Sequence, residues 1–248
     1  MAPLIDLDNI STLPPEGVAK SVAKQELKEV KKSLFELQNK FYADGRFGLL
    51  IILQGMDASG KDGIIRHVFS SMNPQGVHVK SFKKPTEEEL SHDFLWRIYP
   101  HIPPKGMIQI FNRSYYEDII MPMVAGTSSD EMIAHRCQLF KSLEEHLEQN
   151  NIKVVKIFLH ISEKEQAKKI KERLTKPHKR WKYSVEDKKA ANLWDEYQTA
   201  YNSIINNCDN PDWHIIPANK KWYRNYQVAL TLCEHLKKLD LNYPNSTK

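Results

Sequence analysis

The fold is decided by the run Leu49-Leu50-Ile51-Ile52-Leu53-Gln54-Gly55-Met56-Asp57-Ala58-Ser59-Gly60-Lys61-Asp62-Gly63. Its first five residues are apolar without alternation, which is typical of a strand buried on both faces of a parallel sheet. The spacing Gly55-x-x-x-x-Gly60-Lys61 that follows lets backbone amides turn toward an anion while the lysine reaches its outer phosphates. A helix that begins near Asp62 adds the positive end of its dipole. We therefore predict a phosphate-binding loop; the alternative, a glycine-rich turn with a surface lysine, is disfavoured by the strand before it and the helix after it.

Two acidic residues distinguish this loop from the usual one, which places Ser or Thr after the lysine to hold magnesium. Here that position is Asp62, and a second acid, Asp57, lies inside the loop. Two carboxylates beside a phosphate would repel it without a metal ion. We therefore expect Asp57 and Asp62 to bind Mg²⁺, with Mn²⁺ as the alternative. The predicted phosphate ligands of the loop are Gly55, Ala58, Ser59, Gly60, Lys61 and Gly63.

Length and composition indicate an ordinary globular protein. The chain has 248 residues and a net charge of +5, which suits one large domain or a core with an inserted lid. Its cysteines, Cys137, Cys208 and Cys233, show no C-x-x-C pairing, so neither a zinc site nor a disulfide framework is indicated. No apolar run has the length of a membrane span, and the start of the chain lacks a basic region followed by an apolar core. We expect a cytoplasmic protein that does not bind membranes.

Strands and helices are predicted to alternate along the chain. Strands are expected at 49–53, 77–82, 107–111, 152–160 and 213–217, and helices at 18–43, from 62, at 86–98, around 115–120, at 129–149, from 162, at 185–206 and at 220–239. This order predicts an α/β fold with a parallel sheet and helices on both faces, which binds ligands at the carboxyl ends of its strands. We divide the chain into an extended N-terminal arm (1–17), a main domain (18–240) with a lid at about 165–190, and a flexible C-terminal tail (241–248).

Polar and cationic residues follow the first three predicted strands. If these strands are parallel, their carboxyl ends bring to one edge Asp57, Lys61, Lys80, Lys83, Lys84, Asn112 and Arg113. Arg113 follows a buried-looking strand, so its side chain is expected to point into the cleft and grip a phosphoryl group in a bidentate manner. The alternative is a purely structural ion pair with Glu117 or Asp118. Glu117 lies one helical turn later and is expected to orient Arg113 or assist the metal.

A second basic cluster consists of Lys168, Lys169, Lys171, Arg173, Lys176, Lys179, Arg180 and Lys182. Such a run is usually a solvated face, and this alternative holds for the outer lysines. Arg173, Lys176, Lys179 and Arg180 flank Pro177, where a helix is expected to break. We predict that these four residues form a cationic lid that closes over phosphates and expels water.

The predicted helix at 86–98 carries polar residues near the end of the second strand. Asp93 and Arg97 are predicted to contact a base or sugar, whereas Trp96 is interpreted as a core residue. An alternative is that His92 and Asp93 form only an exposed pair.

Three motif regions resemble, in order and spacing, those of the polyphosphate kinase 2 family. They are Gly55–Gly63, Phe111–Asp118, and Lys171–Arg173 continuing to Trp181–Ser184. The segments 73–76 and 89–97 are similar to the family as well, so that the resemblance covers roughly residues 20–240. It implies a thymidylate-kinase-like P-loop kinase fold with a helical cationic lid, and phosphate transfer between inorganic polyphosphate and nucleotides with magnesium.

The resemblance also implies residue roles. The implied catalytic residues are Asp57, Lys61, Asp62, Arg113 and Glu117; the implied lid residues are Arg173, Lys179 and Arg180; and the predicted nucleotide ligands are Asn112, Arg113, Glu117, Asp118, Asp93 and Arg97. Asn112 stands where many members have Asp. This departure, followed by Arg113-Ser114, resembles the single-domain class III members, which accept nucleoside mono- and diphosphates and are oligomeric.

We accordingly predict reversible transfer of the terminal phosphate of polyphosphate to ADP or GDP, and also to AMP, by a homo-oligomer, either a dimer or a tetramer. The nearest alternative is an ATP-dependent nucleoside monophosphate kinase, which would share the loop, Arg113 and a cationic lid. A nucleic-acid-binding module is a more distant alternative, because aromatic residues are few in the basic run. We expect purine nucleotides as partners and no nucleic acid.

Overall fold

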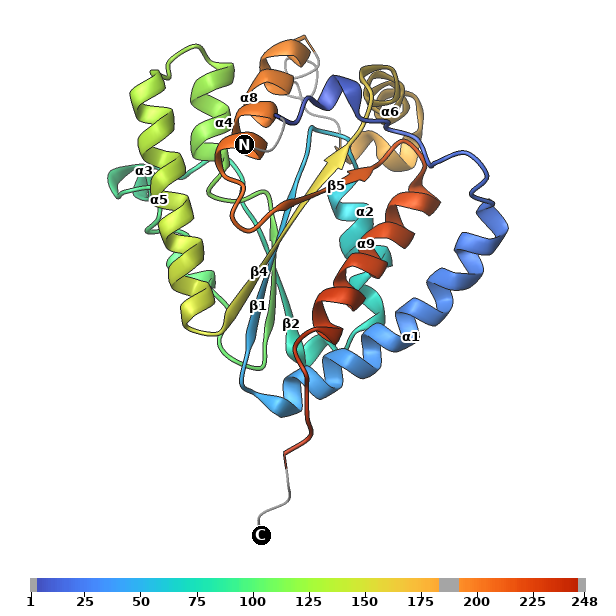
Figure 1. The fold of residues 1–248 in the computed structure, drawn as a ribbon. Coiled ribbons are helices and arrows are strands. Elements are labelled where there is room, and N and C mark those ends of the chain that lie inside the picture. Colours follow the sequence, from blue (N-terminus) through green and yellow to red (C-terminus); the bar gives the residue numbers. More distant parts are fainter. Residues whose placement is uncertain (1–3, 183–191, 245–248) are drawn as a thin grey trace.

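The structure, a computed structural model, describes residues 4–182 and 192–244 (Figure 1). Within these residues the sheet has five parallel strands in the order β2-β3-β1-β4-β5. Their bounds are β1 (Gly48–Gln54), β2 (Val77–Ser81), β3 (Ile108–Asn112), β4 (Ile152–His160) and β5 (Trp213–Pro217). The predicted α/β fold is confirmed. β4 and β5 have the predicted ends, and the others differ by one residue at one or both ends.

Helices cover both faces of the sheet (Figure 1). One face carries α1 (Lys20–Asp44), α2 (Lys61–His67) and α9 (Lys221–Lys237), and the other carries α4 (Glu117–Val124), α5 (Asp130–Gln149) and α8 (Trp194–Asn207). The short α3 (Glu87–Ser91) follows β2, and α6 (Glu163–Thr175) with the 3₁₀ segment Pro177–Lys182 follows β4. The carboxyl ends of the strands point to the top of Figure 1, where α6 also lies.

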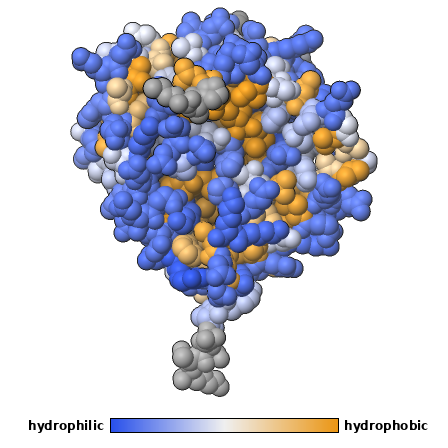
Figure 2. Space-filling model, in the orientation of Figure 1, coloured by the Kyte–Doolittle hydropathy of each residue, from blue (hydrophilic) through white to orange (hydrophobic). Residues whose placement is uncertain are grey.

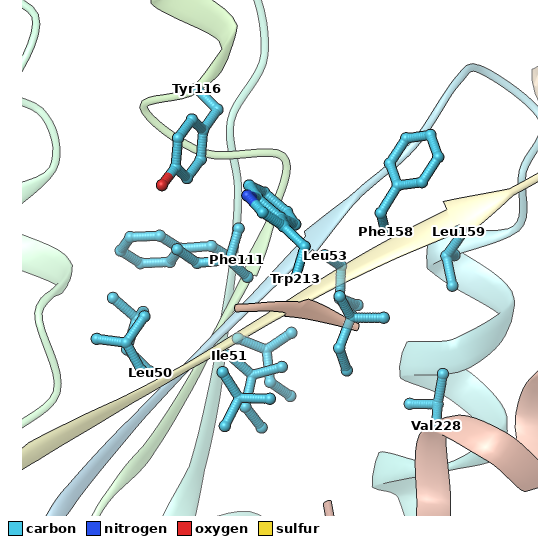
Figure 3. Packing of buried hydrophobic residues seen from close by; sticks show 14 of the residues in the cluster. Leu50, Ile51, Leu53, Phe111, Tyr116, Phe158, Leu159, Trp213 and Val228 are labelled. Carbon is cyan, nitrogen blue, oxygen red and sulfur yellow. The ribbon is translucent and has the colours of Figure 1, made fainter. Parts of the chain in front are cut away.

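The apolar run of β1 lies at the centre of the core. All seven residues of β1 are buried, as expected for a strand with a partner on each side and helices on both faces. In Figure 3, Leu50 and Phe111 lie on one side of the sheet, while Leu53 and Leu159 lie on the side of Val228 from α9. The hydrophobic core is therefore two layers separated by the sheet, and β1 contributes to both.

The prediction of a helix at 86–98 is wrong beyond Ser91, where the helix ends. Its start is as expected, because Thr86 and Glu89 form a capping box in which each side chain accepts from the other residue's N–H. His92 then adopts an extended conformation, and the Asp93 carboxylate accepts a hydrogen bond from the Leu95 N–H at 2.9 Å. This local side-chain bond competes with the helix, as acidic and amide side chains commonly do.

Both ends of the described chain pack on the rest of the molecule. In the predicted N-terminal arm Leu7 is fully buried, and the N–H groups of Ile5 and Leu7 donate to Asn206 and Asn202 of α8. At the other end, the Asn242 N–H donates to Asp44 at 2.7 Å. Residues 1–3, 183–191 and 245–248 lie outside the described residues. Parts of the predicted arm, lid, tail and 185–206 helix therefore fall there, as do Tyr183 and Ser184 of the third motif.

Hydrophilic residues cover most of the face shown in Figure 2, and apolar residues form patches between them. Among the helices of the described chain, none is both long enough and apolar enough for a bilayer-crossing segment.

A buried ion pair joins β4 to α5. Lys156 Nζ lies 2.8 Å from Glu144 Oε2, and both side chains are 0% exposed. The hydroxyls of Tyr115 and Tyr116 donate to Glu144 Oε1 at 2.6 and 2.7 Å, and Lys156 also donates to the Cys208 carbonyl at 2.8 Å. Burial raises the pKa of Glu144 and the charge of Lys156 opposes that rise. The pair therefore depends on both partners, because either charge alone would be buried without compensation.

Lys156→Met is expected to lower the free energy of unfolding by about 3–5 kcal/mol, the usual cost of leaving one buried charge unpaired. Adding Glu144→Gln removes that charge while keeping an acceptor for the tyrosines, so the double variant should recover part of the loss. Urea denaturation of both variants measures this difference. A double variant less stable than Lys156→Met would contradict the argument.

Candidate active site

The loop between β1 and α2 can form only with glycine at two positions. Gly55 has φ +140°, and a Cβ there would lie 2.7 Å from the Leu159 carbonyl oxygen of β4. Gly60 has φ +108°, and Ala58 also takes a left-handed conformation, at φ +64°. These torsions reverse the chain tightly directly after the buried strand, so the loop lies at the carboxyl edge of the sheet.

Lys61 folds back over this loop. Its Nζ donates to the carbonyls of Gly55 at 2.5 Å and Met56 at 3.3 Å. Burial and the nearby charge of Arg113 lower the pKa of Lys61 to about 8, against the opposing charges of Asp57, Glu117 and Asp62. An anion that reaches the loop would stabilise the charged form of this lysine.

Arg113 and Asp57 form the central ion pair of the site. Arg113 Nη2 lies 2.5 Å from Asp57 Oδ1, and the Arg113 N–H donates to the Leu53 carbonyl at 3.1 Å. Arg113 has φ +64°, a conformation that costs about 1–2 kcal/mol in a non-glycine residue. Burial alone would raise the pKa of Asp57, but the charges of Arg113 and Lys61 lower it overall. Asp57 is therefore a carboxylate that holds Arg113 in place.

Glu117 begins α4 beside this pair. Burial raises its pKa, and the charges of Arg113 and Lys61 oppose that rise. Gln54, at the end of β1, lies 3.1 Å from the Ser114 hydroxyl. With its amide turned, Gln54 donates to Glu117 Oε1 at 3.2 Å. Glu117 therefore lies near Arg113 in a buried environment, and its expected role of orienting Arg113 or assisting the metal stays a prediction.

Asp62 faces the end of β3. The Asn112 amide donates to Asp62 Oδ1 at 3.1 Å and lies 3.4 Å from the Ser81 hydroxyl. Asp57 and Asp62 line the same cleft, although no group of three or more His, Cys, Asp or Glu within 4–182 and 192–244 is arranged to hold a metal. Mg²⁺ commonly takes only one or two carboxylates and completes its octahedron with water and substrate phosphates. The oxygen donors of Asp57 and Asp62 fit such a metal.

The cleft has a volume of about 700 Å³. The predicted site residues on its wall are Asp57, Ala58, Gly60, Lys61, Asp62, Gly63, Lys83, Asn112, Arg113, Arg173 and Lys179. The expectation that Asp57, Lys61 and Arg113 would meet at one place is therefore met by the geometry. Gly55 and Glu117 line a small hollow next to Asp57 and Arg113.

Other predicted phosphate ligands lie away from this wall. The Lys80 ammonium lies 5.7 Å from the centre of the Phe82 ring, and Lys84 is exposed outside the cleft lining. Lys176 pairs with Glu172 at 3.0 Å, and Arg180 donates to the Leu174 carbonyl at 3.3 Å. The Ser59 hydroxyl is buried and finds no hydrogen-bond partner in the described chain. The cleft therefore receives only part of the predicted cationic set.

Three predicted nucleotide ligands, Asp93, Arg97 and Asp118, also lie outside the cleft lining. Arg97 is buried and donates to the Lys83 carbonyl at 3.1 Å, while Asp93 caps the turn described above. Burial raises the pKa of Asp118 to about 6, and this residue does not line the cleft. Their role as nucleotide ligands stays a prediction, whereas Asn112 and Arg113 do lie on the cleft wall.

Arg224 of α9 was missed by the sequence analysis. It is 2% exposed, lines the cleft, and donates from Nη1 to the Ser59 carbonyl at 3.0 Å. A Cβ added to Gly60 would lie 1.7 Å from its guanidinium group, and one added to Gly63 would lie 2.8 Å from it. One signal in the sequence could have found it. The helix after β5 starts with basic residues, and the carboxyl end of β5 lies at the same edge of the parallel sheet as the ends of β1, β2 and β3, so these residues could be expected near the loop.

The comparisons with known proteins agree with this geometry. The family model Polyphosphate kinase 2 matches residues 17–244. An AMP/ADP-polyphosphate phosphotransferase of Meiothermus ruber is 42% identical over 227 residues, covering 91% of this chain and 85% of the relative. An ADP-polyphosphate phosphotransferase of Rhodopseudomonas palustris is 39% identical over 228 residues, covering 86% and 79%. The crystal structure of polyphosphate kinase 2 from Arthrobacter aurescens matches with TM-score 0.92 at 37% identity, covering 98% of this chain and 89% of the other.

Gly55→Ala is expected to lower the free energy of unfolding by about 3 kcal/mol, because it adds a collision with the Leu159 carbonyl to backbone strain. Gly126→Ala is the matched control, since Gly126 has φ +66° and nothing within 4 Å of an added Cβ; it should lose only about 1 kcal/mol. Chemical denaturation of both variants separates the collision from the strain. Equal losses would show that the loop tolerates a side chain at Gly55.

Proposed function

This chain belongs to the polyphosphate kinase 2 family and is a polyphosphate–nucleotide phosphotransferase; we propose that its acceptors are ADP, GDP and AMP and that the reaction is reversible. The observation that carries this proposal is the contact between Asp57 and Arg113 beside Lys61, on the wall of one cleft. The fold brings these residues together from the ends of two neighbouring strands.

The reaction joins two anions. A terminal phosphate oxygen of the nucleotide attacks the terminal phosphorus of polyphosphate, a new P–O bond forms, and the P–O bond to the next phosphate unit breaks. The attacking oxygen is already ionised, so the protein needs to supply position and positive charge rather than a base. We assign Lys61 to the outer phosphates and Arg113 to the transferring phosphoryl group, with Asp57 orienting Arg113. Arg173 and Lys179 would complete the cationic wall from the lid side.

Phosphoryl transfer of this kind uses a divalent metal ion, and we propose Mg²⁺, with Mn²⁺ as the alternative. When bound, the metal neutralises charge on the phosphate oxygens. Asp57 and Asp62 are the residues that would hold it. Asn112, which donates to Asp62 at 3.1 Å, would fix the direction of that carboxylate.

We further propose a cytoplasmic homo-oligomer, either a dimer or a tetramer. The three cysteines are free thiols, which fits a reducing compartment. On α1, Val22, Phe35 and Tyr42 are exposed apolar residues that a second copy of the chain would cover. Size-exclusion chromatography with light scattering tests this assembly.

Purified protein with ADP, Mg²⁺ and long-chain polyphosphate is expected to form ATP, measured by luciferase. The two relatives described above are named for polyphosphate, which favours this donor over ATP. The alternative, an ATP-dependent nucleoside monophosphate kinase, predicts no ATP in this assay and ADP from AMP plus ATP. These two results together would show that the phosphate donor is ATP and not polyphosphate.

Lys61→Ala and Arg113→Ala are each expected to lower kcat by about 10²–10³-fold, because each removes a charge that stabilises the transition state. Lys84→Ala is the control, since Lys84 is exposed and lies outside the cleft lining. Circular dichroism establishes that the variants are folded. A folded Lys61→Ala or Arg113→Ala enzyme with wild-type kcat would remove that residue from the mechanism.

A further inference from the structure

Three cations that the mechanism above does not use face one another on the α9 side of the loop. Lys169 comes from α6, and Lys221 and Arg224 come from α9; all three line the active-site cleft. Arg66 and His67 of α2 line the same cleft. In Figure 1, α2, α6 and α9 lie together at one side of the carboxyl edge of the sheet. These residues lie outside the three sequence motifs. Lys169 does belong to the basic cluster described above, which overlaps the third motif.

Arg224 is a buried charge whose hydrogen bonds to described residues all go to neutral groups. Besides the Ser59 carbonyl, its guanidinium donates to Asn225 Oδ1 at 3.0 and 3.3 Å. No described carboxylate forms an ion pair with it, and burial lowers its pKa to about 10. A buried cation without an acidic partner is costly. Arg224 is nevertheless closely fitted, because Gly60 and Gly63 leave space for it.

Lys169 lies close to Arg224 and is poorly neutralised as well. Its side chain is 13% exposed, and its ion-pair partner, Glu165, lies 4.0 Å away. Its Nζ is buried and has no hydrogen-bond partner among the residues that the structure describes. Burial and the charge of Arg224 lower the pKa of Lys169 to about 8, with a smaller contribution from Lys221. A cleft-lining ammonium group with one distant ion-pair partner and no hydrogen-bond acceptor among the described residues is a donor available to a ligand.

Lys221 completes the group at the cleft surface. Burial, then the charges of Lys179 and Arg224, lower its pKa, and Glu172 opposes this shift. Glu172 already forms ion pairs with two other lysines, because Lys176 Nζ lies 3.0 Å and Lys179 Nζ lies 2.5 Å from its carboxylate oxygens. The cations in this part of the cleft therefore lack enough nearby acid, and an anion is the ligand that would relieve their mutual repulsion.

We propose that Lys169, Lys221 and Arg224 form a second phosphate subsite, which binds units of the polyphosphate chain beyond those held by the Gly55–Lys61 loop. This inference rests on the proposed function and adds a direction to it: the chain leaves the loop between α6 and α9. From the sequence we expected Lys80, Lys83 and Lys84, at the end of β2 and just after it, to bind phosphate; of these, Lys83 lines the cleft, whereas Lys80 and Lys84 do not. A polyphosphate repeats its charge at every unit, so one chain can occupy the loop and the subsite together and gain affinity from both.

The test compares two double variants of the whole protein. Lys169→Met with Lys221→Met removes two of the three cations of the proposed subsite. Lys168→Met with Lys220→Met changes the residue that precedes each of them in the sequence, Lys168 within α6 and Lys220 at the N-cap of α9; both of these lysines are exposed and outside the cleft lining. Arg224 is left unchanged because it also supports the loop. The KM for long-chain polyphosphate is measured at saturating ADP and Mg²⁺, and the KM for ADP at saturating polyphosphate.

The cleft pair of substitutions is expected to raise the KM for polyphosphate about tenfold, equivalent to about 1.4 kcal/mol, and to leave the KM for ADP unchanged. The control pair should leave both constants unchanged. The rise in melting temperature caused by polyphosphate without nucleotide gives the same comparison independently of turnover, because at a fixed ligand concentration a tighter-binding ligand stabilises the folded state more.

An unchanged KM for polyphosphate in the cleft variant, or an equal rise in the control, would overturn the subsite while leaving the proposed function in place. A wild-type protein that makes no ATP from polyphosphate would instead overturn the proposed function, and the subsite with it.

Discussion

Positive charge held close together, and partly removed from water, is the constraint on which this structure depends. Lys61, Arg113 and Arg224 converge on one loop from α2, the end of β3 and α9. Removing a cation from water is costly, and burial lowers the pKa values of both Lys61 and Arg224. For Lys61 the nearby charge of Arg113 lowers the pKa further, because like charges in a medium of low dielectric repel strongly. Hydrogen bonds and an ion pair hold the three side chains in these positions: Lys61 donates to the Gly55 carbonyl, Arg113 pairs with Asp57, and Arg224 donates to the Ser59 carbonyl. A phosphate chain bound at this loop, as proposed above, would supply the missing negative charge.

Acidic residues adjust this charge without cancelling it. Asp57 lies 2.5 Å from Arg113 and keeps a lowered pKa, so it stays ionised and fixes the arginine. Glu117 is affected mainly by burial, which raises its pKa. Asp62 is turned toward Asn112 and is suited to a metal. The three acids thus have different environments, and those environments follow from their positions in the loop, at the start of α4 and at the start of α2.

The sequence was sufficient where local patterns decide the structure. The apolar run of β1 and the β-branched run of β4 can hardly be anything other than buried strands, and Gly55 and Gly60 mark positions that side chains cannot occupy. It was insufficient where a contact crosses the chain. Arg224 donates a hydrogen bond to the Ser59 carbonyl, although the two residues are 165 positions apart in the sequence. Nothing in the sequence near Arg224 shows that two glycines of the loop leave space for its side chain. The end of α3 was misjudged for a different reason, since one Asp93 hydrogen bond outweighs a regular apolar pattern.

The buried ion pair beneath α4 connects the stability of the fold to the geometry of the site. Tyr115 and Tyr116 lie between Arg113 and Glu117 in the chain, and both hydroxyls donate to Glu144 at 2.6 and 2.7 Å. The turn that carries Arg113 is therefore anchored within three residues by a carboxylate that Lys156 neutralises. A hydrophobic replacement of this network could give equal stability, but it would provide no directional bonds to the two tyrosines. Directional bonds fix the turn, and a fixed turn is what allows Arg113 to keep its strained backbone and its contact with Asp57.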